Sequence, residues 1–272
     1  GAYLASYDFP STKNGSDHYT PFLQHLGIAS LNLGFAGESG GGDYHSIYDS
    51  FDHYARFGDG SFDYGVALAK VGGRAVLRLA NAEVLPFDVS GFTDTGGRYA
   101  KEVVKLADDL RAEAEEENLR LDEKTYALAA DPQEVWVLPE RKAALPFLNF
   151  APLQNAQSRL ESATRAYQQA AARRGGKSLA PATQKALDDL WRRSERSLTR
   201  PEGLPLRPWF KHQIYAPGFY TGYGVKTLPG IREALEQRDW RAAGEQIQVV
   251  AAILEGFAGI IDQATALVAG GE

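Results

Sequence analysis

The stretch from about Arg241 to Ala269 constrains the fold more than any other part of the chain, because it predicts a long helix that is apolar on two faces. One face carries Ile247, Val250, Leu254, Phe257, Ile261 and Val268. The second face carries Val249, Ile253, Ile260 and Leu267. Such a helix needs two partners, and the second is either a neighbouring helix of the same chain or a copy of the molecule across a two-fold axis.

Most of the chain beyond Pro86 also has a helical pattern. A first helix is predicted by an apolar stripe at Tyr99, Val103, Leu106 and Leu110. Residues 154–174 and 181–198 predict two more helices, which Gly175-Gly176 separates. Residues 201–217 hold four prolines among aromatic side chains, so we expect an extended segment packed on another surface.

The first part of the chain follows a different pattern. Residues 27–35 alternate in polarity and predict a strand, and the glycine-rich stretch 37–43 predicts a tight loop. Helices are expected over 46–58, with Ser46 as a candidate N-cap, and over 62–81. The order strand, loop, helix, helix is that of the end of an α/β domain.

These two patterns divide the chain. We expect the C-terminal portion of an α/β domain over residues 1–92 and an all-α helical-bundle domain over residues 93–272, with the boundary marked by Pro86 and the run 89–97. The chain as a whole should therefore be mostly helical.

Composition excludes several functions. A formal net charge of −6 gives no attraction to nucleic acid, so no nucleic-acid partner is expected. No run of about eighteen apolar residues occurs, so we expect no membrane segment in this chain. The absence of cysteine excludes disulfides and thiol catalysis. The chain also lacks methionine, so Gly1 indicates processing or truncation.

His45 has the most informative position among the histidines. It follows the glycine loop at the mouth of the helix predicted over 46–58, where α/β folds collect functional groups. The sequence contains no His-Glu-x-x-His motif, and Gly40-Gly41-Gly42 lacks the lysine of a phosphate loop. From the residues alone, His45 is either a metal ligand or a helix-start histidine bonded to backbone.

Several short segments follow one another in a recognisable order. They are Gly15-Ser16-Asp17, Gln24-His25-Leu26-Gly27-Ile28-Ala29, Tyr44-His45-Ser46-Ile47-Tyr48-Asp49, Val84-Leu85-Pro86-Phe87-Asp88, Gly203-Leu204-Pro205, Ile214-Tyr215-Ala216-Pro217 and Leu228-Pro229-Gly230-Ile231. Together they resemble landmarks of the glutamate carboxypeptidase II and transferrin receptor family of M28 zinc peptidases, and they span nearly the whole chain.

The resemblance implies a zinc-dependent exopeptidase in which two zinc ions activate a bridging water toward a peptide substrate. His45 matches the histidine that completes the zinc shell in this family. Tyr44 matches a tyrosine that donates its phenol to the developing oxyanion, and packing beneath the loop is the alternative role for this ring.

Three further residues acquire expected roles from the resemblance. Ser16 and Asp17 match positions that touch the substrate backbone, and Tyr223 matches a tyrosine in a loop that closes over the substrate pocket. The alternatives are a helix cap for Asp17 and an ordinary loop aromatic for Tyr223.

The chain departs from the family pattern in its metal ligands. The other zinc ligands of the family lie in segments without a counterpart here, and Glu115-Glu116-Glu117 is typical of a solvated helix face. Zinc needs three or four converging ligands, so the remaining ligands should lie outside this chain. We therefore expect this chain alone to be inactive.

A second departure concerns specificity. Acidic-peptide members of the family hold substrate carboxylates with arginines and a lysine, but the matching positions here are Asn32, Gly34 and Gly222. Without this clamp we expect a neutral or apolar pocket rather than a preference for C-terminal glutamate. Lys226, from a shifted loop, is the candidate replacement.

The leading prediction is that this chain is the C-terminal part of a zinc exopeptidase that forms a homodimer through its helical domain. The alternative is a non-catalytic, transferrin receptor-like scaffold for binding and dimerisation. Retention of Tyr44 beside His45 favours the enzyme. Family analogy adds the expectation of an extracytoplasmic location.

Overall fold

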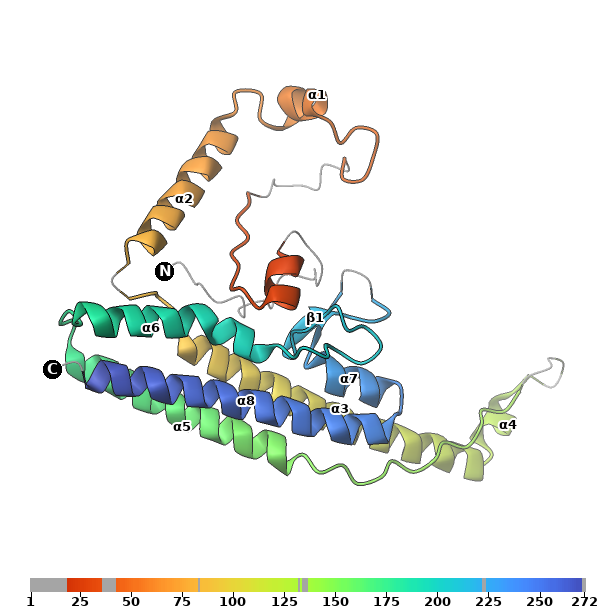
Figure 1. Cartoon of the computed structure of the whole chain (residues 1–272). Coiled ribbons are helices and arrows are strands. Elements are labelled where there is room, and N and C mark those ends of the chain that lie inside the picture. Colours follow the sequence, from red (N-terminus) through yellow and green to blue (C-terminus); the bar gives the residue numbers. More distant parts are fainter. Residues whose placement is uncertain are drawn as a thin grey trace.

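The structure is a computed structural model that describes residues 19–35, 43–82, 84–131, 133, 137–221 and 224–270. The described chain is mostly helical, as predicted, and its only sheet has two short strands. Figure 1 shows a bundle of long helices with a thinner N-terminal part extending from one side of it.

The bundle is organised around its last helix. Its long helices are α3 (Val89–Asp122), α5 (Ala151–Arg174), α6 (Pro181–Ser194) and α8 (Trp240–Ala269). The helix α8 packs along α5 and also contacts α6, α7 (Pro229–Glu236) and η3 (Glu195–Leu198). Residues of its first apolar face are buried, and Ile253, Ile260 and Leu267 of the second face pack half-buried on the same core. Both faces of α8 therefore find partners within the chain.

The same helix bears on the prediction that the chain has no membrane segment. By length and composition alone, α8 meets the requirements for a helix that spans a membrane. In the structure it is the central helix of the bundle, and 39% of its most apolar window is buried. The absence of a membrane segment therefore stays a prediction.

The helix α3 begins earlier than the sequence pattern indicated. Asp88 is its N-cap, and its Oδ1 accepts the backbone N–H groups of Ser90 at 3.0 Å and Gly91 at 3.1 Å. Burial alone would raise the pKa of Asp88, but the Ser90 hydroxyl and these two N–H groups hold it below its ordinary value. The run 89–97 is thus the start of a helix, and the expected division between residues 92 and 93 falls inside it.

Close packing explains why this glycine-containing run is helical. The Gln157 Nε2 on α5 donates to the Thr93 carbonyl at 2.9 Å. A Cβ placed on Gly97 would lie 3.0 Å from that same nitrogen, so the missing side chain allows α3 and α5 to approach closely. Tertiary packing here outweighs the weak helix propensity of glycine.

Beyond the bundle, α3 continues into an arm with α4 (Thr125–Ala129), which Figure 1 shows projecting from one end. The acidic face of α3 in this arm is solvated, as predicted, because Glu115 and Glu116 are exposed. Glu113 pairs with Lys142 on the returning chain at 2.8 Å, so the arm is held by charged surface contacts.

The extended segment predicted over 201–217 is present and buried where it meets the N-terminal helix η1 (Pro21–Leu26). The Gln24 carbonyl accepts the N–H groups of Lys211 at 2.8 Å and His212 at 3.1 Å. Gly27 ends η1 with a φ of 63°, and a Cβ there would lie 2.6 Å from the Arg196 Cα. Only glycine fits this contact, which ties η1 to the bundle.

The segment ends in the antiparallel hairpin of β1 (Tyr215–Pro217) and β2 (Val225–Thr227), where Ala216 lies opposite Lys226. The helix α7 follows directly and lies beside the hairpin (Figure 1). This arrangement places charged residues of α7 against the two strands.

The chain between η1 and the bundle is different. Residues 27–35, expected as a strand, have no regular secondary structure, since no strand among the described residues pairs with them. The helix expected from Ser46 begins only at Phe51, with Ser50 as its N-cap, because residues 44–48 form turns. The α/β part of the fold therefore stays a prediction.

The remaining N-terminal helices are α1 (Phe51–His53), η2 (Tyr54–Gly58) and α2 (Asp63–Ala80). The helix α2 matches the helix predicted over 62–81, yet none of its residues is buried. Asp59 is the single buried residue among residues 43–82. Its Oδ2 accepts the Gly65 N–H at 2.8 Å and the Tyr54 hydroxyl at 3.1 Å, which fixes the corner between η2 and α2.

Candidate active site

A tight turn carries the two residues with predicted catalytic and metal-binding roles. The Ser46 N–H donates to the Asp43 carbonyl at 2.9 Å, and the Ser46 hydroxyl donates to the same oxygen at 2.7 Å. These bonds close the turn over Tyr44 and His45. Ser46 therefore stabilises the turn, and it is not the N-cap that the sequence predicted.

Tyr44 and His45 lie side by side on this turn. Their rings stack with centroids 3.9 Å apart, and both side chains are exposed, Tyr44 to 70%. His45 has a φ of 60°, an unfavourable value for a residue with a Cβ, which the turn imposes. The turn thus presents an imidazole and a phenol together at the surface of the described chain, and both expected roles of Tyr44 stay predictions.

These residues do not by themselves fit a zinc ion. Near His45 in sequence, the His53 Nδ1 approaches the Asp43 Oδ2 at 3.8 Å, which is an ion-pair distance if the histidine is protonated. Across the described ranges, no three His, Cys, Asp or Glu side chains are placed to hold a metal ion. A zinc site at His45 would need ligands from outside the described residues.

His212 is excluded as a ligand by its surroundings. It is fully buried, and its Nε2 lies 2.9 Å from the Glu195 Oε1. Its Nδ1 accepts the N–H groups of Ile214 and Tyr215, each at 3.2 Å. Both ring nitrogens are engaged, so this histidine holds the chain that enters β1.

Three predicted substrate-binding residues, Ser16, Asp17 and Tyr223, lie outside the described residues. Their expected roles stay predictions. The strands β1 and β2 flank residues 222–223 and belong to the described part of the chain. Their contacts show how this hairpin is held.

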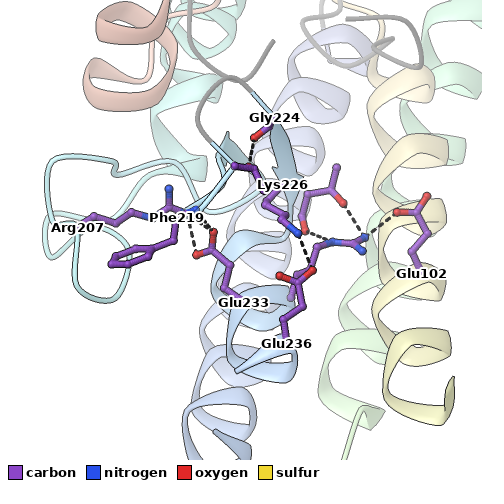
Figure 2. Close-up of polar contacts among 10 residues, drawn as sticks. Glu102, Arg207, Phe219, Gly224, Lys226, Glu233 and Glu236 are labelled. Atoms are coloured by element: carbon purple, nitrogen blue, oxygen red, sulfur yellow. Dashed lines mark hydrogen bonds and ion pairs between the residues drawn. The ribbon is translucent and has the colours of Figure 1, made fainter. Parts of the chain in front are cut away.

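A buried ion pair anchors this hairpin, and neither of its members has a predicted role. Arg207 donates to both carboxylate oxygens of Glu233 at 2.7 and 2.8 Å, with each side chain only 10% exposed. Arg207 also donates to the Pro217 carbonyl. The Phe219 N–H donates to Glu233 at 2.8 Å, and Figure 2 shows Phe219 and Arg207 beside that carboxylate. Burial lowers the pKa of Arg207, and Glu233 opposes that shift.

Arg207 follows shortly after the Gly203-Leu204-Pro205 landmark, and its partner lies 26 residues further along the chain. No local pattern links residues at that separation. The acidic residue that completes the anchor therefore had no signal in a single sequence.

Lys226, the candidate replacement for a substrate-carboxylate ligand, already has a carboxylate partner. Its Nζ lies 2.6 Å from the Glu236 Oε1 on α7. Its charge is therefore neutralised within the chain. Asn32 and Gly34, at the positions of family arginines, are exposed on the irregular segment after η1.

Comparison with known proteins identifies the family. Residues 148–262 match the model of the transferrin receptor-like dimerisation domain. The chain belongs to the transferrin receptor-like, glutamate carboxypeptidase-like family. The matched residues run from the start of α5 into α8, so the family model covers most of the bundle.

Similar curated proteins are peptidases by name. The chain is 30% identical to "Probable glutamate carboxypeptidase LAMP1" of Arabidopsis thaliana over 86% of this chain and 29% of that protein. It is 30% identical to a "Probable glutamate carboxypeptidase" of Arthroderma benhamiae over 91% of this chain and 30% of the relative. It is 24% identical to "Aminopeptidase NAALADL1" of Rattus norvegicus over 93% of this chain and 31% of that protein. The chain thus spans about a third of the length of these relatives.

Proposed function

We propose that this chain is the C-terminal part of a zinc-dependent exopeptidase of the M28 type, and that its bundle forms a homodimer. The observation that carries the proposal is the exposed turn that pairs Tyr44 with His45 in a chain related to carboxypeptidases and aminopeptidases.

The surroundings of this turn support an origin in a larger domain. Large apolar side chains are exposed throughout the N-terminal part: Ile28, Leu31, Leu33, Phe35, Ile47, Tyr48, Phe51, Phe57, Tyr64, Val66, Val71, Val76 and Leu77. A folded domain seldom leaves so many large apolar side chains in water within one stretch of chain. We infer that the rest of an α/β domain covers it and supplies the missing zinc ligands.

Within that domain the residues of this chain would have defined tasks. His45 would contribute one imidazole to a two-zinc site, which when bound activates water for peptide hydrolysis. Tyr44 would donate its hydroxyl to the oxyanion that forms at the scissile carbonyl. Loss of a single oxyanion donor costs roughly 10²–10³ in kcat.

The proposal is tested on the full-length protein with zinc. Wild type should hydrolyse short peptides, Tyr44→Phe should lower kcat by roughly 10²-fold or more, and His45→Ala should lower the bound zinc measured by elemental analysis. His53→Ala is the matched histidine control and should retain zinc. A full-length protein that binds no zinc and cleaves no peptide would support the non-catalytic, receptor-like scaffold instead.

The 272-residue chain alone provides a second test. It should bind no stoichiometric zinc and show no peptidase activity, because His45 lacks partners among the described residues. The homodimer is tested separately by the solution mass of the full-length protein. A strictly monomeric mass at high concentration would contradict that part of the proposal.

A further inference from the structure

One end of the bundle contains a cavity that has no role in the proposed peptidase. There the last turn of α5, the loop of residues 175–180 that leads into α6, and the end of α8 come together (Figure 1). The cavity between them has a volume of about 400 Å³. Sites for small molecules typically have volumes of about 300–1,000 Å³, so this cavity has the size of a ligand site.

The floor of the cavity is apolar. Leu187 of α6 is fully buried, Val268 of α8 is 7% exposed, and Leu179 packs half-buried against the core. The Tyr167 ring on α5 also lines the cavity, and it meets the Trp191 ring edge to face with centroids 5.3 Å apart. Burial raises the pKa of the Tyr167 hydroxyl, so the phenol stays uncharged near neutral pH. This floor suits the apolar body of a ligand.

The polar wall of the cavity carries positive charge only. The polar side chains on this wall are those of Arg174, Lys177, Ser178 and Gln184. No Asp or Glu side chain lines the cavity, and neither Arg174 nor Lys177 has a carboxylate partner in the described part of the chain. The nearby Lys185 of α6, by contrast, is paired with Asp189 at 2.5 Å. An anion in the cavity would therefore meet two cations whose charge no acid has neutralised.

Backbone carbonyls hold Arg174 in position. Its Nε donates to the Lys177 carbonyl, and its Nη1 donates to the Val268 carbonyl at 3.3 Å. Carbonyls at a helix end carry only partial negative charge, so the guanidinium keeps most of its own charge. Its Nη2 has no partner among the described residues and can donate to an anion. A donor that is already fixed in place loses little freedom when a ligand binds.

We propose that this cavity binds a small monocarboxylate that has an apolar body and no amino group. The carboxylate would lie against Arg174 and Lys177, and the body would lie on Tyr167, Leu187 and Val268. The inference goes beyond the proposed function, because this ligand is neither a peptide nor an amino acid and the site lies on the bundle.

The charge of the wall decides this ligand class. An amino acid or an unblocked peptide carries an ammonium group, which finds no carboxylate on the wall and is repelled by Arg174 and Lys177. An uncharged molecule gains only the apolar contact. Phosphate is best held by a guanidinium that offers two nitrogens, whereas Nε and Nη1 of Arg174 already bind carbonyls. A singly charged carboxylate fits the donors that remain.

The test compares four probes by calorimetry on the full-length protein. The expected ligand is 3-phenylpropanoate. Phenylalanine has the same skeleton with an added ammonium, 3-phenylpropanamide has the same skeleton without the charge, and inorganic phosphate is an anion without an apolar body. We expect 3-phenylpropanoate to bind at least about tenfold more tightly than each of the other three.

Variants assign the binding to this cavity, because a zinc site could also bind a carboxylate. Arg174→Gln should weaken the binding of 3-phenylpropanoate about tenfold, and Lys177→Gln about threefold. Arg173→Gln is the matched control, because Arg173 bonds to the Gln169 carbonyl and does not line the cavity, so the affinity should not change. Ala171→Phe fills the cavity from an exposed position and should abolish the binding at this site.

The outcomes are decisive without any assay of peptidase activity. The inference is overturned if phenylalanine or phosphate binds as tightly as 3-phenylpropanoate, or if 3-phenylpropanoate does not bind at millimolar concentration. It is also overturned if Lys177→Gln and Ala171→Phe leave the affinity unchanged, and these two variants decide the matter should Arg174→Gln fail to fold. A protein that binds the carboxylate as expected but cleaves no peptide would refute only the proposed function.

Discussion

The bundle and residues 43–82 both contain helices with apolar stripes, but these helices have very different environments. In α8 ten residues are buried, whereas α2, with an apolar stripe of its own, buries none. Local pattern is enough to form a helix in both places. Only the bundle contains the partners that convert an apolar stripe into a core, so the stability of the chain should reside there.

Amide hydrogen exchange should show this contrast most strongly. Amides in α5 and α8 can exchange only when the bundle opens, which predicts protection factors on the order of 10⁴ or more. Amides in α2 need only local fraying, so protection below about 10² is expected there. Equal protection in α2 and α8 would show that the N-terminal part is as stable as the bundle.

The buried pair of Arg207 and Glu233 should give the largest effect of a single substitution. Glu233→Gln leaves a buried guanidinium without its counter-charge, which should cost about 3–5 kcal/mol of unfolding free energy. Urea unfolding monitored by tryptophan fluorescence measures the loss. Asp52→Asn removes the exposed pair with Arg56 in the N-terminal part and should leave the midpoint unchanged.

A matched pair of leucine truncations tests the cores directly. Leu160 on α5 is fully buried, so Leu160→Ala should cost about 2–5 kcal/mol. Leu77 on α2 is 63% exposed, so Leu77→Ala should change the unfolding free energy by less than about 0.5 kcal/mol. In the full-length protein, by contrast, Leu77→Ala should become costly, because we infer that a larger domain covers this face. An unchanged full-length protein would count against that cover.

The smallest expected effect concerns the boundary between the two regions. Asp88→Ala removes the N-cap of α3 and should cost about 1 kcal/mol. The folded pKa of Asp88 is lowered, so its contribution is present above its ordinary value of 3.8 and is lost as the pH falls through the folded pKa. Wild type and Asp88→Ala should therefore differ in urea midpoint at pH 6 and converge at low pH; a constant difference would contradict this role.

Sequence alone predicted the parts of the fold that depend on local periodicity. The helices α2, α5 and α8 were predicted within a few residues, because their apolar residues repeat with the helical period. The start of α3 was missed, since glycines and threonines over 89–97 resemble a linker and only packing on Gln157 makes them helical. The strand over 27–35 did not appear, because a strand needs a neighbour.

The candidate site divides in the same way. The turn with Tyr44 and His45 was recognisable as a motif, whereas the contacts of Arg207 with Glu233 and of Lys226 with Glu236 join separate elements. Those pairings depend on where α7 lies relative to the hairpin. A single sequence contains no record of that placement.

The central position of α8 also determines when the bundle can form during synthesis. The ribosome makes α8 after every other helix of the bundle, yet α5, α6 and α7 all pack on it. At roughly 5–20 residues per second, the apolar faces of α5 and α6 wait several seconds for α8 to emerge. A nascent chain that stalls before residue 240 would expose them all, so this family member should depend on chaperones until its last helix is complete.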